Sequence, residues 1–115
     1  MKKSLTNETT NAILDFLFRN GIFCFRQNSG GIPLFRDGIL TGFRPGGKIG
    51  QPDIVGILPP NGKYLGIEIK TGRDRLSEGQ VAFHSQARKA GATILVVKTF
   101  EDFKTQFYGL PEKIA

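Results

Sequence analysis

Residues 52–70 read PDIVGILPPNGKYLGIEIK, in which two apolar runs flank a Pro-Pro-Asn-Gly segment. Both runs are rich in β-branched residues, and the segment between them favours a turn, so we predict a β-hairpin. Depending on the pairing register, Asp53 lies opposite Ile69 or, one residue along, opposite Glu68. Either register brings two carboxylates together with Lys70, because cross-strand neighbours lie about 5 Å apart.

These three side chains suit one kind of chemistry. In a strand, Glu68 and Lys70 share one face, while apolar residues occupy the other. Two adjacent carboxylates resist joint ionisation unless a cation lies between them, and Mg²⁺ or Mn²⁺ prefers such oxygen ligands. The metal can polarise a phosphodiester and activate water, which Lys70 would orient. The alternative is a surface ion pair of Glu68 with Lys70, worth about 0–1 kcal/mol.

The pattern resembles the PD-(D/E)XK nuclease superfamily, and more closely its VRR-NUC branch. The Pro-Asp of Asp53 and the Glu-x-Lys of residues 68–70 carry the resemblance. The Leu-Ser-x-x-Gln of residues 76–80 is similar to that branch's entry into its next helix. The likeness covers about residues 5–103. It implies a restriction-endonuclease-like core and a Mg²⁺-dependent DNA nuclease, with Mn²⁺ able to substitute, of the stand-alone phage or bacterial type.

The resemblance implies further site residues. Glu8 would complete the metal site from the first helix, although an acid near a helix N-terminus is also favourable by itself. Gln80 would contact the active-site lysine or a phosphate, or would act only as the capping-box partner of Ser77. The implied catalytic residues are Asp53, Glu68, Lys70 and Gln80, and the implied metal ligands are Glu8, Asp53, Glu68 and the carbonyl of Ile69.

Composition is compatible with this class. At 115 residues, 39% hydrophobic and 23% charged, we expect one globular domain spanning residues 1–115. The net charge of +6 favours a polyanionic partner such as DNA. No apolar run approaches the roughly 18 residues that span a membrane, and no signal peptide is recognisable. The single Cys24 excludes an internal disulfide. We expect a cytoplasmic protein, in the host cytoplasm if phage-encoded.

The pattern of apolar residues predicts an α/β fold of order α-β-β-β-α-β-α. We expect a helix over 5–20, a strand over 22–26, the hairpin, a helix from Ser77 to about Ala90, a strand over 94–98 and a helix over 100–108. The glycine-rich stretch 29–52 is expected to hold one or two additional short strands. The last strand should lie parallel to that of Glu68 through a right-handed crossover, in a mixed sheet with helices on its faces.

Basic side chains are candidate phosphate contacts, with a solvated loop as the alternative. They are Arg26, Arg36, Arg44 and Lys48 around the glycine-rich stretch, of which we expect two to bind, and Arg73 and Arg75 after the active lysine. His84, the sole histidine, is expected at a polar surface or boundary position, and Cys24 as a small buried hydrophobe.

We therefore expect a metal-dependent DNA endonuclease acting on branched DNA such as four-way junctions. Alternatives are a basic DNA-binding module without activity and a nuclease for flap or simple duplex DNA. An RNA-directed nuclease with a His-Lys-Tyr set is disfavoured by the single histidine. Leu14 and Phe18 form, with Thr10, a second apolar line on the first helix, which predicts a homodimer interface. The alternative is that residues 103–110 cover this line.

Overall fold

The computed structural model describes residues 2–27, 32–44 and 49–111, with the backbone alone for residues 2–4. Its elements are α1 (Lys2–Arg19), β1 (Phe23–Arg26), β2 (Ile32–Arg36), β3 (Ile39–Arg44), β4 (Ile54–Leu58), β5 (Lys63–Ile69), α2 (Glu78–Lys89), β6 (Thr93–Val97) and α3 (Phe100–Tyr108). Apart from β2 and β3, which lie in the stretch expected to hold extra strands, the order is the predicted α-β-β-β-α-β-α.

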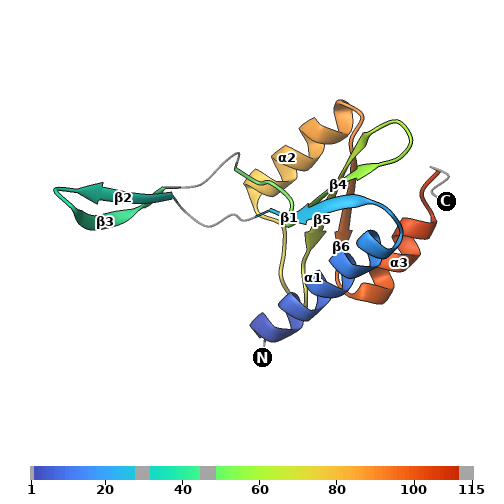
Figure 1. Cartoon of the computed structure of the whole chain (residues 1–115), viewed down its shortest axis with the longest axis horizontal. Coiled ribbons are helices and arrows are strands. Elements are labelled where there is room, and N and C mark those ends of the chain that lie inside the picture. The colour runs from blue at the N-terminus through green and yellow to red at the C-terminus, as the bar shows by residue number, and fades with distance from the viewer. Residues whose placement is uncertain (1, 28–31, 45–48, 112–115) are drawn as a thin grey trace.

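A four-stranded mixed sheet forms the centre of the fold, in the order β1-β4-β5-β6 (Figure 1). The pairs β1–β4 and β4–β5 are antiparallel, while β6 lies parallel to β5. The parallel pairing of β6 with β5 confirms the prediction for the last strand, and the connection between them contains α2. As a result, one end of the sheet holds the C-terminal ends of β1, β5 and β6 and the N-terminal end of β4. We call this end the sheet edge.

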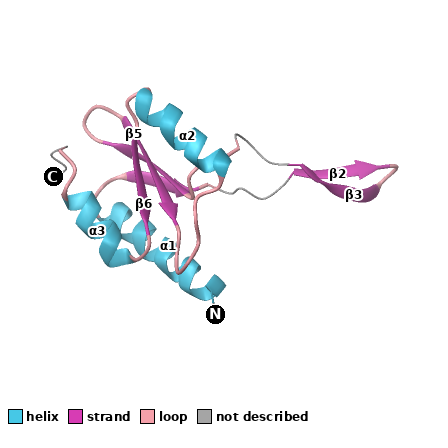
Figure 2. Cartoon of the chain, turned by 180° about the vertical axis from the view of Figure 1, so that it is seen from behind, coloured by secondary structure: helices cyan, strands magenta, loops and turns pink. Residues whose placement is uncertain are grey.

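Helices cover both faces of the sheet. On one face, α1 and α3 pack against the central strands, and α2 lies on the other (Figures 1 and 2). Side chains of α1, α3 and three strands make the core together with Ile22, which precedes β1: Ile13, Leu17, Ile22, Ile54, Leu58, Leu65, Ile67, Ile69, Leu95, Val97, Phe103 and Phe107. The ring of Phe16 meets that of Phe103 edge to face at 5.5 Å and so joins α1 to α3.

The register of the central hairpin places Asp53 next to Glu68. Ile54 pairs with Ile67 and Leu58 with Lys63, which is the second of the two predicted registers. Four residues therefore form the turn, and the N–H of Gly62 closes it by donating to the carbonyl of Leu58 at 2.9 Å. Gly62 has a φ of +76°, which glycine adopts without strain.

The line predicted on α1 runs from the interior to the surface. Thr10 is buried and Leu14 packs against the core, whereas Phe18 is 79% exposed. The expectation of a continuous exposed line was therefore wrong for Thr10, because the helix turns this face partly toward β1. Nothing among the described helices is long and apolar enough to cross a membrane.

Strands β2 and β3 form a separate two-stranded arm that projects from the body (Figures 1 and 2). Asp37 and Gly38 connect the strands, with φ of +52° and +78°, as in the Asp-Gly turns that suit tight hairpins. The large apolar side chains of the arm are exposed: Ile32, Leu34, Phe35, Ile39, Leu40 and Phe43. The sequence predicted short strands here but did not predict that they leave the central sheet.

Candidate active site

Asp53 is held at the edge of the sheet, immediately before β4. Its Oδ2 accepts the N–H of Ile69 at 2.7 Å, and its own carbonyl accepts the N–H of Gln27 at 2.8 Å. The preceding Pro52 is buried, and a methyl group on Gly66 would lie 2.6 Å from its ring. The Pro-Asp pair thus fixes the carboxylate between the ends of β1 and β5.

Glu68 projects from β5 toward α2 and is 1% exposed. Its Oε2 accepts a hydrogen bond from Nε2 of Gln80 at 3.1 Å. Its Oε1 lies 3.2 Å from Nε2 of His84. Each carboxylate oxygen therefore has one partner on the same helix.

The pKa of Glu68 is raised to about 8, first by burial and then by the charge and hydrogen bonding of Asp53. The charge of Lys70 acts in the opposite direction. The two carboxyl groups therefore interact closely, and one of them holds a proton at neutral pH unless a cation is bound. The atoms that Asp53 and Glu68 offer to a metal are carboxylate oxygens. Such oxygens fit a hard divalent ion, which binds through one or two carboxylates and fills its other positions with water or phosphate.

Lys70 follows β5 and extends its pairing with β6, because its N–H donates to the carbonyl of Val97 at 2.9 Å. By strand alternation its side chain lies on the face of Glu68. Its charge lowers the pKa of both Glu68 and His84, so the ammonium is near both. The structure brings together the predicted Asp53, Glu68 and Lys70.

Gln80 forms the predicted capping box, and its side chain also contacts Glu68 instead of the lysine that the resemblance implied. Ser77 caps α2, and its Oγ accepts the N–H of Gln80 at 3.1 Å. The side-chain Oε1 of Gln80 accepts the N–H of Ser77 at 2.8 Å, which completes a capping box. The remaining amide nitrogen reaches Glu68, not the lysine.

His84 was misplaced by sequence reasoning, since it is 2% exposed rather than at the surface. Its pKa is lowered by burial and then by the charges of Arg88 and Lys70, so the imidazole is neutral at pH 7. A signal was available: His84 lies four residues after Gln80, one helical turn further along the same face. A capping glutamine that faces the sheet predicts that His84 faces it too.

Glu8 is not brought to this cluster. Within residues 2–27, 32–44 and 49–111, no group of three acidic, histidine or cysteine side chains lies close enough together to hold a metal ion, so Glu8 does not join Asp53 and Glu68 as a third carboxylate. The hydroxyl of Thr6 contacts that of Thr71 at 2.7 Å, so Thr6 marks the side of α1 that faces the site. Glu8 is exposed and lies about 200° around the helix from Thr6. The resemblance implied a metal ligand at Glu8, but the position of α1 that faces the site is occupied by Thr6.

The carbonyl of Ile69 points to the side of β5 on which Asp53 lies, as a metal ligand beside Asp53 would need. The N–H of Ile69 points to Asp53, and the N–H and C=O of one strand residue point to the same side. Its side chain is core, as predicted.

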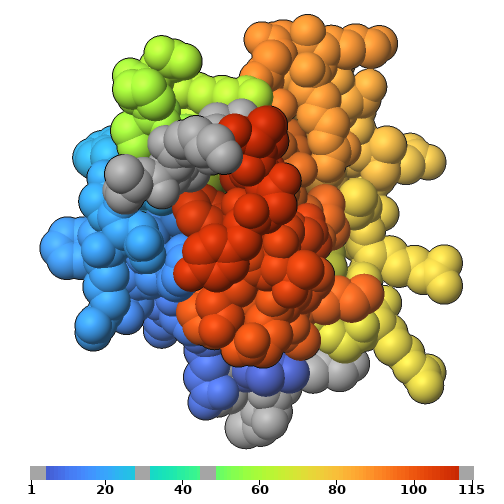
Figure 3. All heavy atoms as spheres, turned by 90° about the vertical axis from the view of Figure 1, so that its right-hand side faces the viewer, coloured from blue at the N-terminus to red at the C-terminus, as the bar shows by residue number. Residues whose placement is uncertain are grey.

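The predicted basic contacts fall into two groups. Arg26 ends β1 beside Asp53 and donates to Asn7 at 3.1 Å, and Arg73 and Arg75 lie exposed in the loop between β5 and α2. This loop, yellow in Figure 3, projects long side chains into solvent. Arg36 and Arg44 lie on the arm, away from the carboxylates. Lys48 lies outside the described residues.

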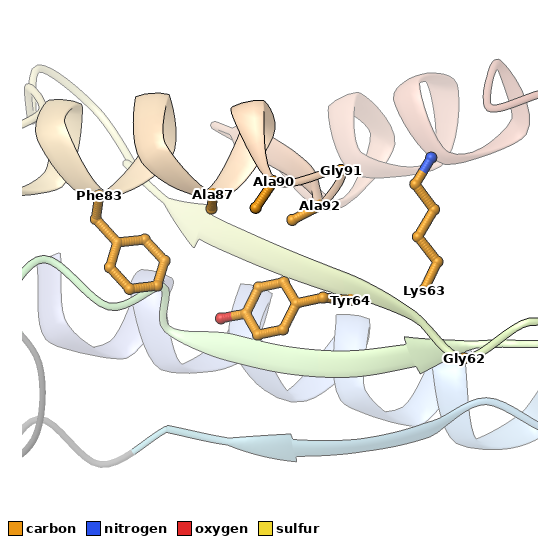
Figure 4. A pocket seen from close by; sticks show the side chains of 8 residues that line it. All are labelled: Gly62, Lys63, Tyr64, Phe83, Ala87, Ala90, Gly91 and Ala92. Carbon is orange, nitrogen blue, oxygen red and sulfur yellow. The ribbon is translucent and has the colours of Figure 1, made fainter.

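A hollow of about 430 Å³ lies at the other end of α2. Figure 4 shows Tyr64 of β5 and Phe83 of α2 projecting into the space between these elements. The pKa of Tyr64 is raised by burial and by the charge of Glu68, so its hydroxyl stays protonated. The residues that line the hollow carry no carboxyl, imidazole or thiol group. The carboxyl groups of Asp53 and Glu68 and the imidazole of His84 therefore do not line this hollow.

Comparison with known proteins finds a matching family model and a similar fold. A family model described as the VRR-NUC domain matches residues 36–101, more than half of the chain. A solved structure titled "VRR_NUC domain" is similar in fold, with a TM-score of 0.63 and 20% sequence identity. The similarity covers 90% of this chain and 95% of that one. Comparison with curated protein sequences gives no match.

Proposed function

The chain belongs to the VRR-NUC family, a family of nuclease-type domains, and from this we propose that it is a divalent-metal-dependent endonuclease that hydrolyses DNA phosphodiester bonds. The observation that carries the proposal is the contact between the carboxyl groups of Asp53 and Glu68, with the charge of Lys70 close by. A buried acid with a pKa of about 8 beside a second carboxylate is stabilised in its charged form by a cation.

Asp53, Glu68 and the carbonyl of Ile69 would hold Mg²⁺, or Mn²⁺ in its place. A bound ion of this kind polarises the scissile phosphodiester and lowers the pKa of water. Lys70 orients the attacking water and offsets negative charge that develops on the phosphate. Glu8 is not part of this ligand set, because it lies on the outer side of α1.

DNA would approach the edge of the sheet between two basic borders. Arg26 lies on the β1 side, and Arg73 and Arg75 lie on the α2 side. Phosphate contacts by arginine supply affinity without sequence preference. Backbone binding of this kind suits recognition of DNA shape.

The proposal also includes a homodimer that acts on branched DNA. A two-fold dimer presents two identical sites, which matches the two-fold symmetry of a four-way junction. The interface was predicted at Leu14 and Phe18; Phe18 is exposed, whereas Leu14 packs against its own core.

The arm offers a second surface for this dimer. A two-stranded hairpin is at best marginally stable alone, and this one exposes six large apolar side chains. A second apolar surface, Phe23, Phe25 and Ile57, lies on β1 and β4 on the face that α2 occupies over β5 and β6. Exchange of arms between two copies would cover both surfaces.

Cleavage assays with four-way junction, flap, duplex and single-stranded DNA test the activity and its substrate together. We expect cleavage with Mg²⁺ or Mn²⁺, none with EDTA, and the highest rate on the junction. DNA binding without cleavage of any substrate would favour the alternative of a basic binding module. Faster cleavage of flap or duplex DNA would overturn the junction preference alone.

Metal binding is tested separately by calorimetry. We expect Asp53→Asn to weaken Mn²⁺ binding to the protein without changing its fold. An unchanged Mn²⁺ affinity in Asp53→Asn would remove Asp53 from the ligand set.

A further inference from the structure

Two side chains of α2 hold the two oxygens of one carboxylate. Gln80 donates from Nε2 to Oε2 of Glu68 at 3.1 Å, and Nε2 of His84 lies 3.2 Å from Oε1. The two residues are four apart, so they project from one face of the helix. Gln80 is fixed in turn by its capping box with Ser77.

The other nitrogen of His84 decides where its proton lies. Nδ1 is buried and has no hydrogen-bond partner among the described residues. If Nε2 accepted a hydrogen bond from a protonated Glu68, the neutral ring would carry its own hydrogen on Nδ1, as a buried N–H without a partner. A buried N–H without a partner is rarer than a buried acceptor without one. The geometry therefore favours the tautomer with hydrogen on Nε2.

We propose that His84 is a positioning residue, which donates its Nε2–H to Oε1 of Glu68 and, together with Gln80, fixes the orientation of that carboxylate for binding a divalent cation. The inference rests on the proposed role of Glu68 as a metal ligand. With one N–H donor on each oxygen, rotation of the carboxylate is restricted, and its remaining lone pairs stay available on the side of Asp53. Partners that orient a metal ligand typically contribute about 10–100-fold to metal affinity.

A matched pair of variants separates this role from packing. His84→Gln places an amide nitrogen near the position of Nε2, whereas the amide of His84→Asn ends one atom short, at the position of Nδ1. We expect Mn²⁺ affinity, measured by calorimetry, to stay within about threefold in His84→Gln and to fall roughly 10–100-fold in His84→Asn. The control is Ser85→Ala, an exposed neighbour on α2, which should bind as the wild type does.

Nitrogen-15 NMR of the histidine ring in the metal-free wild type gives an independent readout. We expect the spectrum of a neutral ring with hydrogen on Nε2, and a purely space-filling role would not require this tautomer. Hydrogen on Nδ1, or equal Mn²⁺ affinity in wild type and His84→Asn, would overturn the positioning role alone. A wild type that binds no Mn²⁺ would overturn the metal-ligand role of Glu68 and the positioning role with it.

Discussion

The proposed chemistry depends on three ionisable side chains at close range, two carboxyl groups and one ammonium group. Glu68 is buried beside Asp53, and Lys70 partly offsets their repulsion. The strand places Glu68 and Lys70 on one face, and the Pro-Asp corner supplies Asp53 from the neighbouring strand. Changing one residue therefore alters either metal binding or water activation, and these effects can be measured separately.

Lys70→Ala should abolish cleavage while DNA affinity changes by no more than a few-fold. The reason is its place on the face of Glu68, apart from the arginines at the borders of the site. Loss of a group that positions or activates water costs roughly 10²–10⁴-fold in rate. Single-turnover cleavage and fluorescence anisotropy measure the two quantities. Lys89→Ala, at the exposed end of α2, serves as the control. Substantial turnover by Lys70→Ala would argue against its assigned role.

Glu68 should make the stability of the metal-free protein depend on pH. Its pKa rises from an ordinary 4.5 to about 8 on folding, so the folded protein binds this proton more tightly than the unfolded chain does. The resulting stability is fully present below about pH 4.5 and is lost as the pH rises through about 8.

Thermal unfolding in EDTA checks this dependence against Glu68→Gln, whose neutral amide imitates the protonated acid. The melting temperature of wild type should fall relative to that of Glu68→Gln between about pH 5 and pH 9, and Mg²⁺ should restore it in wild type only. Parallel pH profiles for the two proteins would contradict the raised pKa.

At the scale of elements, the sequence predicted most of what local patterns control. Helix α3 and the capped start of α2 lie where expected, because Ser77 and Gln80 are a local signal. The sequence allowed two hairpin registers, with Asp53 opposite Ile69 or opposite Glu68. The four-residue turn gives the second register, and the length of this turn was not known from the sequence alone. The spacing of Gln80 and His84 predicts that both lie on one face of α2, but the packing of that face on β5 is a tertiary contact that the local pattern does not contain. For the same reason, Glu8 could not be excluded until the inward face of α1 was known.

The N-caps of α2 and α3 allow the site's dependence on α2 to be tested. Ser77→Ala should destabilise the protein by about 0.5–2 kcal/mol, and Thr99→Ala, which removes the cap of α3, by a similar amount. Only Ser77→Ala also loosens the first turn that carries Gln80, so only this variant should lose cleavage rate under conditions in which both proteins are fully folded. Chemical denaturation and single-turnover cleavage provide the two measurements. Equal rates in the two variants would mean that the cap does not support the site.

At the scale of the whole molecule, the carboxylate site lies on the body, apart from the apolar arm that projects from it (Figure 1). The basic borders lie next to the carboxylates, whereas the largest group of exposed apolar side chains lies on the arm. Exposed apolar patches of this kind usually mark an interface. The sequence predicted a homodimer interface from Thr10, Leu14 and Phe18 of α1. Of these three only Phe18 is exposed, because Thr10 is buried and Leu14 packs against the core.

Replacement of arm residues should therefore dissociate the dimer without disturbing the catalytic body. We expect wild type at tens of micromolar to show twice the chain mass of 12.7 kDa by light scattering, and Phe35→Ser/Phe43→Ser to show the single mass. Both residues lie on the arm, outside the central sheet. Metal-dependent cleavage of simple duplex should therefore survive in the variant, while paired incision of a four-way junction is lost.

Phe18→Ser tests the predicted α1 surface in the same way, and Leu5→Ser, exposed elsewhere on α1, is the control. Dissociation by Phe18→Ser but not by the arm variant would place the interface on α1, and a wild-type mass of 12.7 kDa would refute both the dimer and its paired incision.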